Sequence, residues 1–317
     1  MTLIAPTAPA SSPAARRRRR RGSGTSLVVA LMVMLGVSVL LYPSAASWFS
    51  LLEQSQRVSE YTEVMDELGP EGRLEELAAA REYNATLTGG ALIDPYGGTP
   101  LSDQRAIVAA YREQLDLGPA EVMARVRIPA IDVDLPIYHG TDEETLRRGI
   151  GHLLGSALPV GGEGTHSVLT GHRGLPESVL FNDLDHVVVG DIFQVDVYGE
   201  VLTYEVRDVQ VIEPGDTDLL MPEIGRDLVS LVTCTPLGVN SHRIIVTGER
   251  IPTPAAAEAE LEMPDLPGDP WWAVGLALGW GFAAAYRSLS ARPEPAPTSP
   301  RAAAPAPPKQ HITGIIV

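Results

Sequence analysis

The sequence predicts a mainly β fold, a closed or nearly closed barrel preceded by helices and flanked by two apolar segments. Three observations support this. Between residues 122 and 250 apolar residues alternate with a period of two, in short runs separated by turn residues. Upstream of residue 122 the apolar spacing is three to four, which is typical of helices. Counting the alternating runs gives about seven or eight strands, the number that closes a small barrel.

Charge and cysteine content narrow the class of protein. The chain has 317 residues and a net charge of −16, and all but one of its 40 acidic residues lie between Tyr42 and Trp271. A surface this acidic repels phosphate, so we do not expect nucleic acid as a partner. The single cysteine, Cys234, excludes an internal disulfide, and the stability of the barrel must come from its core.

The N-terminal region predicts a membrane anchor. Residues 1–25 are rich in Ala, Pro, Ser and Arg and are expected to form a disordered basic tail. Residues 26–46 are apolar over nearly the length a bilayer requires, as a transmembrane helix or signal anchor. The alternative is a cleaved signal peptide, because Ser44-Ala45-Ala46 resembles a small-residue cleavage site. The arginines at 16–21 place the N-terminus in the cytoplasm.

Residues 47–121 are predicted to be a helical region interrupted twice. Gly69-Pro70 breaks the first helical pattern. Residues 88–100 contain four glycines and two prolines, which predicts a loop. Ser102 is placed to cap a third helix that contains Ile107 and Leu115.

The barrel region, residues 122–250, divides into short runs of strand length. Val122–Gly140 supplies two of them and Asp142–Arg148 a short helix. The remaining predicted strands are Ser167–Thr170, Ile192–Val197, Val201–Ile212, Val229–Thr233 and His242–Val246.

The C-terminal region predicts a second membrane span. Residues 251–270 form a Pro/Ala/Glu linker, and residues 271–289 are an apolar segment with tryptophans at one end and Arg287 at the other. Residues 290–317 are a low-complexity tail, expected to be disordered. Two spans would leave both termini in the cytoplasm and the acidic domain outside the cell membrane.

Cys234 is the first candidate for chemistry. Its strand ends at Thr235-Pro236, since proline cannot donate to a ladder, and Gly238 to Asn240 turn the chain. The returning strand then sets Arg243 across from the thiol. A lone thiol at a strand end beside a cation indicates a nucleophile, whereas the alternative is a small buried hydrophobe.

A nucleophilic thiol needs a proton-transfer partner. His172 is the best candidate among the seven histidines, because it follows a strand within a glycine-bounded loop. Arg243 stays protonated and cannot be a base, so it is expected to stabilise an oxyanion or position substrate; the alternative is an ordinary surface arginine. The other histidines are assigned lesser roles: His139 as a weaker candidate, His152, His166 and His186 as structural residues, and His242 as a neighbour of Arg243. One thiol and scattered histidines predict neither a metal site nor a cofactor.

Three motifs, TGHRG around His172, LVTCTP around Cys234 and NSHR ending at Arg243, resemble the sortase signature over residues 122–250. The resemblance implies an eight-stranded barrel and a cysteine transpeptidase. Cys234 would attack the Thr–Gly bond of an LPXTG-like signal and form a thioester, with His172 as general acid/base and Arg243 as oxyanion or substrate stabiliser. Ser230 departs from the pattern, since a threonine often stands there.

Two further features resemble class C, the pilin-polymerising sortases. One is the C-terminal span, and the other is the segment Asp94-Pro95-Tyr96, similar to the lid of that class. The resemblance implies that Asp94 pairs with Arg243 while the ring of Tyr96 covers Cys234, with flanking glycines allowing the lid to swing. The alternative for this tripeptide is an ordinary turn.

The sequence thus predicts a membrane-anchored class C sortase of a Gram-positive cell. Its partners would be membrane lipid and pilins or other surface proteins that carry LPXTG-like signals, joined through lysine amines in pilus assembly. Two alternatives stay open: a housekeeping sortase that attaches proteins to cell-wall peptidoglycan, and a non-catalytic scaffold tethered to the membrane.

Overall fold

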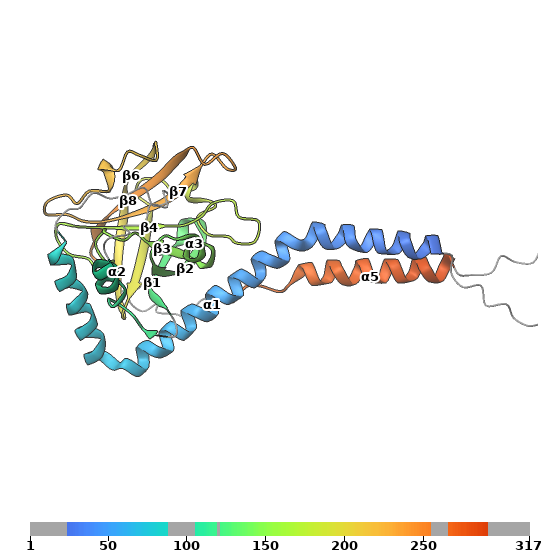
Figure 1. Ribbon diagram of the computed structural model, residues 1–317, viewed down its shortest axis with the longest axis horizontal. Coiled ribbons are helices and arrows are strands. Elements are labelled where there is room, and N and C mark those ends of the chain that lie inside the picture. The colour runs from blue at the N-terminus through green and yellow to red at the C-terminus, as the bar shows by residue number, and fades with distance from the viewer. Residues whose placement is uncertain (1–23, 88–104, 119–120, 255–265, 291–317) are drawn as a thin grey trace, which may run out of the picture. The chain divides into compact units, whose positions relative to one another are not determined.

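The structure is a computed structural model that describes residues 24–87, 105–118, 121–254 and 266–290. The chain divides into two compact units. One contains Val39–Gly275, and the other combines Met1–Ser38 with Leu276–Val317. Helix α1 (Gly24–Thr86) contributes residues to both units (Figure 1).

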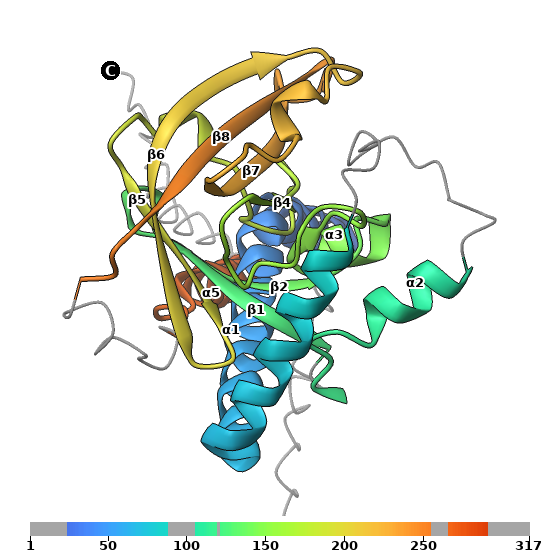
Figure 2. The same cartoon turned by 90° about the vertical axis from the view of Figure 1, so that its left-hand side faces the viewer.

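The larger unit contains a closed barrel with the strand order β1-β2-β3-β4-β7-β8-β6-β5 (Figure 2). This confirms the mainly β, eight-stranded fold. The strands are β1 (Val122–Ile128), β2 (Val133–His139), β3 (Ile150–His152), β4 (Thr165–Thr170), β5 (Ile192–Val197), β6 (Glu200–Ile212), β7 (Asp227–Thr235) and β8 (His242–Ile251). The sequence analysis missed β3, whose three residues include a central glycine.

Two of the strand pairs are parallel, and one of them positions the candidate site. β4 pairs in parallel with β7, in a register that runs from Thr165 opposite Asp227 to Thr170 opposite Val232. β7 then pairs antiparallel with β8, its neighbour on the other side. The carboxyl ends of β4 and β7 therefore lie at the same edge of the barrel, beside the start of β8.

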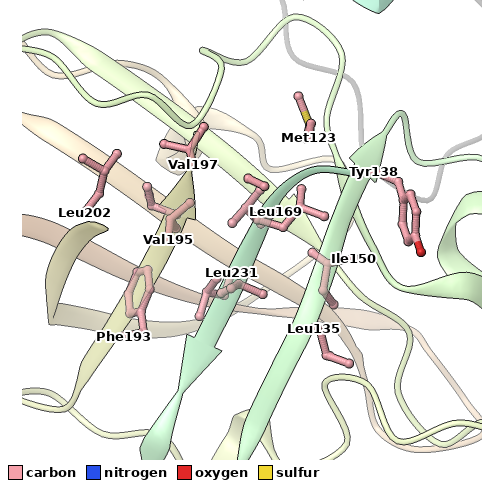
Figure 3. Close-up of a cluster of buried hydrophobic side chains, with 14 of the residues drawn as sticks. Met123, Leu135, Tyr138, Ile150, Leu169, Phe193, Val195, Val197, Leu202 and Leu231 are labelled. Atoms are coloured by element: carbon pink, nitrogen blue, oxygen red, sulfur yellow. The ribbon is translucent and has the colours of Figure 1, made fainter. Parts of the chain in front are cut away.

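The strands bury different side chains on their two faces. Leu169 of β4, Leu231 of β7 and Ile244 of β8 join the main core, part of which is drawn in Figure 3. Val168 and Val232 belong instead to a separate apolar cluster with Ile245, Leu153 and Leu220. Because successive side chains in a strand point to opposite faces, this second cluster marks the outer face of β4, β7 and β8.

Within the larger unit, α1 is fastened to the barrel by polar contacts. The side-chain amide of Asn84 donates to the carbonyl of Leu158 at 3.0 Å and accepts from its N–H at 2.7 Å. The backbone N–H of Tyr198 donates to the hydroxyl of Tyr61 at 2.8 Å. The helix breaks at Gly69, where φ is 71°, a conformation glycine adopts without strain. The predicted break at Gly69-Pro70 is therefore confirmed.

Two shorter helices lie against the barrel unit. α2 (Arg105–Arg112) buries Tyr111, and α3 (Glu143–Arg148) begins where Asp142 accepts a hydrogen bond from the N–H of Thr145 at 3.0 Å. Three short 3₁₀ turns, η2 (Pro129–Ile131), η3 (Leu184–His186) and η4 (Asp218–Leu220), complete the connections. The expected cap at Ser102 lies outside the described residues.

In the smaller unit, α1 and α5 (Trp271–Ser290) run side by side (Figure 1). Ala30, Met34 and Ala283 form a small apolar cluster between them, and a Cβ placed on Gly279 would lie 3.2 Å from Val37. Small residues allow this close approach of two helices. Among the described residues, α1 is the one helix long and apolar enough to cross a membrane. The second span therefore stays a prediction.

Candidate active site

The β7–β8 hairpin places Cys234 directly opposite Arg243. β7 ends at Thr235, and the N–H groups of Val239 and Asn240 both donate to the carbonyl of Pro236, at 3.1 and 2.9 Å. Asn240 adopts a left-handed φ of 57° that turns the chain back into β8. Directly opposed residues of an antiparallel pair have Cβ atoms about 4.5–5.5 Å apart, within contact distance for a thiol and a guanidinium.

The β4–β7 register continues beyond the end of β4 and brings His172 to the level of Cys234. The N–H of Gly171 donates to the carbonyl of Val232 at 3.0 Å, and the hydroxyl of Thr233 donates to the carbonyl of Gly171 at 2.7 Å. Continued two residues past the pair Thr170–Val232, at which β4 ends, this register aligns the backbone of His172 with that of Cys234. The three residues named from the sequence thus lie on three adjacent strands or their direct extensions.

The three residues also share one face of the barrel. Cys234 lies two residues after Val232 in β7, and Arg243 lies two residues before Ile245 in β8. Each therefore points to the same face as that apolar residue, and both apolar residues belong to the outer-face cluster. His172 lies four residues after Val168, an outer-face residue of β4. The side chains of Cys234 and Arg243 therefore lie on the outer face of the barrel at one edge, and the alternation continued past the end of β4 assigns His172 to the same face.

Burial of the three side chains is unequal. Cys234 and Arg243 are each 7% exposed, whereas the His172 side chain is 18% exposed. A buried thiol also fits the alternative of a small core hydrophobe, but its cross-strand neighbour here is a cation. Nη1 of Arg243 donates to the carbonyls of Asn240 at 3.0 Å and His242 at 3.2 Å, so the hairpin turn orients the guanidinium.

Gly171 is required by the packing beside His172. A Cβ at this position would lie 2.7 Å from Cδ1 of Ile150 and 2.8 Å from Cδ2 of Phe181. Contacts this short force the surrounding groups to move. The glycine in TGHRG therefore lets the loop that carries His172 pack closely on the core.

Glu143, which no motif in the sequence singled out, lies beside His172. Its Oε2 is 3.4 Å from Nε2 of His172, and its Oε1 accepts a hydrogen bond from Nε of Arg147 at 3.0 Å. Glu143 belongs to α3, and the β3 strand that follows α3 pairs with the end of β4. The only signal in the sequence was the predicted helix itself, because no motif links it to TGHRG.

The other histidines within the described part of the chain are held in structural or surface positions. His152 is completely buried, and burial lowers its pKa to about 4. Burial also lowers the pKa of His139 and that of His166, and a ring nitrogen of each lies within 3.0 Å of a backbone carbonyl oxygen. His186 is largely exposed, and His242 lies on the surface 2.8 Å from the Ser241 hydroxyl. Within the described ranges, no group of His, Cys, Asp or Glu is arranged to hold a metal ion.

The predicted lid residues Asp94, Pro95 and Tyr96 lie outside the residues the structure describes. Their pairing with Arg243 and cover over Cys234 accordingly remain expectations from the sequence.

Comparison with known proteins identifies the family. Residues 126–251 match the model of the sortase domain. The crystal structure of sortase C-1 from Actinomyces oris is 49% identical, with a TM-score of 0.54, over 57% of this chain and 99% of that one. The chain belongs to the sortase family. Sortase C of Streptococcus pneumoniae is 39% identical, with a TM-score of 0.56, over 62% of this sortase and 96% of that chain.

Among curated proteins, the sortase is 32% identical to sortase D of Bacillus subtilis over 130 residues. The matched region is 40% of this chain and spans 62% of the length of that relative. The similar solved structures include class C sortases, in agreement with the resemblance noted in the sequence.

Proposed function

We propose that this sortase is a membrane-anchored cysteine transpeptidase of class C. It cleaves an LPXTG-like signal between Thr and Gly and joins the new acyl group to a lysine amine of a pilin. The observation that supports the proposal is the strand register, which pairs Cys234 with Arg243 and, continued past Thr170, aligns His172 with Cys234.

In the first half of the reaction, the Cys234 thiolate, whose proton His172 has taken, attacks the threonine carbonyl carbon with its sulfur, and the C=O electrons move to the oxygen. Arg243, opposite Cys234, stabilises that oxyanion with charge-assisted hydrogen bonds. The tetrahedral intermediate collapses by breaking the C–N bond, and His172 supplies the proton that the glycine amine takes as it leaves. A thioester on Cys234 results.

In the second half, the acceptor amine attacks the thioester carbonyl and gives a proton to His172. The C–S bond breaks, the sulfur takes back its electron pair, and an amide bond joins donor and acceptor. His172 thus acts first as acid and then as base, which requires an imidazole that solvent and substrate can reach. The His172 side chain is 18% exposed although its Nε2 is buried, whereas His152 is buried completely.

The choice of a pilin as substrate is supported by the similar structures. The crystal structure of the pneumococcal sortase C is described as informative on the pilin substrate specificity of that enzyme. The Asp94-Pro95-Tyr96 segment adds a class C feature at the sequence level. We propose that this segment is a lid, so that Asp94→Ala or Tyr96→Ala makes Cys234 react faster with thiol reagents. Unchanged alkylation rates would exclude that role.

Membrane anchoring is supported by α1, which has the length and apolarity of a span. α5 packs against α1 in the smaller unit through small residues, which fits a second, paired span with both termini in the cytoplasm. Labelling of added cysteines at the two termini from each side of intact cells, in a Cys234→Ala background, tests this topology. Accessibility of either terminus from outside would refute it.

The test of the chemistry is mass spectrometry of the acyl-enzyme. The full chain in detergent is incubated with LPXTG-like peptides, and a thioester adduct is sought on the one cysteine that the sequence contains. Cys234→Ala should remove the adduct, and His172→Ala should slow its formation by about a thousandfold or more. His186→Ala is the matched control, because that histidine is exposed. An active Cys234→Ala enzyme would refute the proposal and favour a scaffold.

The acceptor is tested by competition. A pilin domain with its lysine and a peptidoglycan-like amine are supplied together, and the two products are separated by mass. Preference for the pilin lysine supports class C, whereas preference for the peptidoglycan amine assigns the housekeeping role.

A further inference from the structure

Arg173, the residue after His172, has a buried guanidinium that contacts three residues in two separate segments of the chain. Its side chain is 8% exposed. Nε donates to the carbonyl of Asn182 at 2.8 Å, Nη1 donates to the hydroxyl of Thr235 at 3.4 Å, and Nη2 lies 2.5 Å from Oδ2 of Asp185. None of these partners is adjacent to Arg173 in the sequence.

The contact with Thr235 joins the two halves of the candidate site. Thr235 is the last residue of β7 and follows Cys234 directly. Arg173 is covalently attached to His172, so one side chain spans from the residue beside the imidazole to the residue beside the thiol. On the other side of His172, the bond from Thr233 to the carbonyl of Gly171 makes the corresponding link. His172 is thus held from both sides at the level of Cys234.

The loop that carries His172 has little regular structure, and besides these contacts it is held by the buried side chains of Leu180 and Phe181 and by the Ser178 hydroxyl, 3.0 Å from that of Ser50 in α1. Between β4 and η3 the loop is closed by two hydrogen bonds, from the N–H of Phe181 to the carbonyl of His172 at 3.1 Å and from the N–H of Gly174 to Oδ1 of Asn182 at 2.7 Å. Both bonds are internal to the loop. Arg173 adds an ion pair to Asp185 of η3 and, through Thr235, a link to the barrel strand β7.

We propose that Arg173 is a positioning residue that sets the placement of the His172 imidazole relative to the Cys234 thiol. The proposal rests on the transpeptidase function given above. A guanidinium suits this role because its planar N–H groups diverge in fixed directions, and three acceptors can be held at once. A lysine ammonium keeps the charge but is a point donor at the end of a flexible chain, and it cannot reproduce the three-way geometry.

The variant that tests this is Arg173→Lys, which preserves the positive charge beside Asp185. We expect kcat for acyl transfer to fall by about tenfold or more, with KM changed less than about twofold, because a misplaced catalytic group lowers the rate of the chemical step. Wild-type kcat in a folded variant would overturn the proposal. So would a raised KM at unchanged kcat, which would indicate direct substrate binding.

A second variant, Thr235→Val, removes the acceptor on β7 and leaves Arg173 paired with Asp185. Thr235→Val should also lower kcat. The double variant should have a kcat no lower than that of Arg173→Lys alone, because both substitutions break the same contact between Arg173 and Thr235. Additive losses would show that the two residues act separately and would refute the proposal. Thr235→Val leaves Arg173 unchanged and alters the side-chain volume little. It therefore tests the same link even where Arg173→Lys has a folding defect.

Two further measurements separate this inference from the proposed function. Arg81→Lys is the control, because Arg81 forms a surface ion pair with Glu200 at 2.5 Å on the α1 side of the barrel and should leave kcat unchanged. Hydrogen exchange of residues 171–183 needs no substrate, and it should speed up in Arg173→Lys but not in Arg81→Lys. If exchange is unchanged, the positioning role fails; if wild type forms no thioester, the proposed function fails instead.

Discussion

The buried histidine of β3, His152, makes the stability of the barrel depend on pH. Its Nε2 lies 2.8 Å from the carbonyl of Ala157, so Nε2 carries the hydrogen, and its Nδ1 faces the Tyr111 hydroxyl at 2.9 Å. The neutral ring satisfies both contacts. Protonation would add a charge in a completely buried position.

The magnitude follows from the pKa of this side chain, which burial lowers from 6.5 to about 4. Below pH 6.5 His152 is protonated in the unfolded chain but stays neutral in the folded chain. The free energy of unfolding therefore falls as the pH drops from about 6.5 to about 4. A difference of this size corresponds to about 3 kcal/mol, most of it lost by pH 4.5. Above pH 6.5 His152 contributes no pH dependence.

The perturbation is His152→Gln, whose amide can still donate to the Ala157 carbonyl but does not titrate. The melting temperature of the full chain in detergent is followed by near-ultraviolet circular dichroism at pH 7.5 and 4.5. Wild type should lose about 5–10 °C more than the variant between these values. Burial lowers the pKa of His139 and of His166 as well, so the comparison between variant and wild type is needed to isolate His152.

The control is His186→Gln, which changes an exposed histidine and should leave the pH dependence as in wild type. Equal losses of melting temperature in wild type and His152→Gln would refute the reasoning. They would mean that the ring takes up its proton in the folded state without penalty.

Three other substitutions test the packing that supports the site. Gly171→Ala should lower kcat/KM by about tenfold or more, since its Cβ would displace the loop before His172, and a wild-type rate in the peptide assay would contradict this. Asp196→Ala should destabilise the barrel by about 3–5 kcal/mol in denaturant unfolding, because it leaves the partly buried guanidinium of Arg127, which donates to Asp196 at 2.9 and 3.0 Å, without its partner. A loss below about 1 kcal/mol would show that water replaces the carboxylate. Tyr61→Phe should cost about 1–3 kcal/mol by leaving a buried N–H of the barrel without its acceptor, and hydrogen exchange of α1 that matches wild type would exclude this.

Local patterns in the sequence were sufficient to predict the β7–β8 hairpin. An apolar run, a proline and a Gly/Asn turn determine where β7 stops and β8 starts, and these fix Arg243 across from Cys234. The helical region and its break at Gly69 were predictable for the same reason. The apolar spacing of a helix and the Gly-Pro pair that ends it are both visible in residues adjacent in the sequence.

Features that depend on contacts between distant segments were not predictable. β3 has three residues, and it is a strand only because β2 and β4 provide hydrogen-bonding partners on both sides. Glu143 lies near His172 because β3 follows α3 and pairs with β4. No local sequence pattern predicts this strand pairing. The contacts of Arg173 were hidden likewise, although its place beside His172 in TGHRG was visible.

The parallel pairing of β4 with β7 explains why the two motifs must keep their positions within their strands. A shift of one residue between these strands would move His172 to the face opposite Cys234, because side chains alternate. The register is held by alternate apolar residues: Leu169 and Leu231 face the core while Val168 and Val232 face the outer cluster. Two residues beyond Val232 and four beyond Val168, the same alternation assigns thiol and imidazole to one face. The hydrophobic pattern that folds the barrel therefore also aligns the groups that we propose carry out acyl transfer.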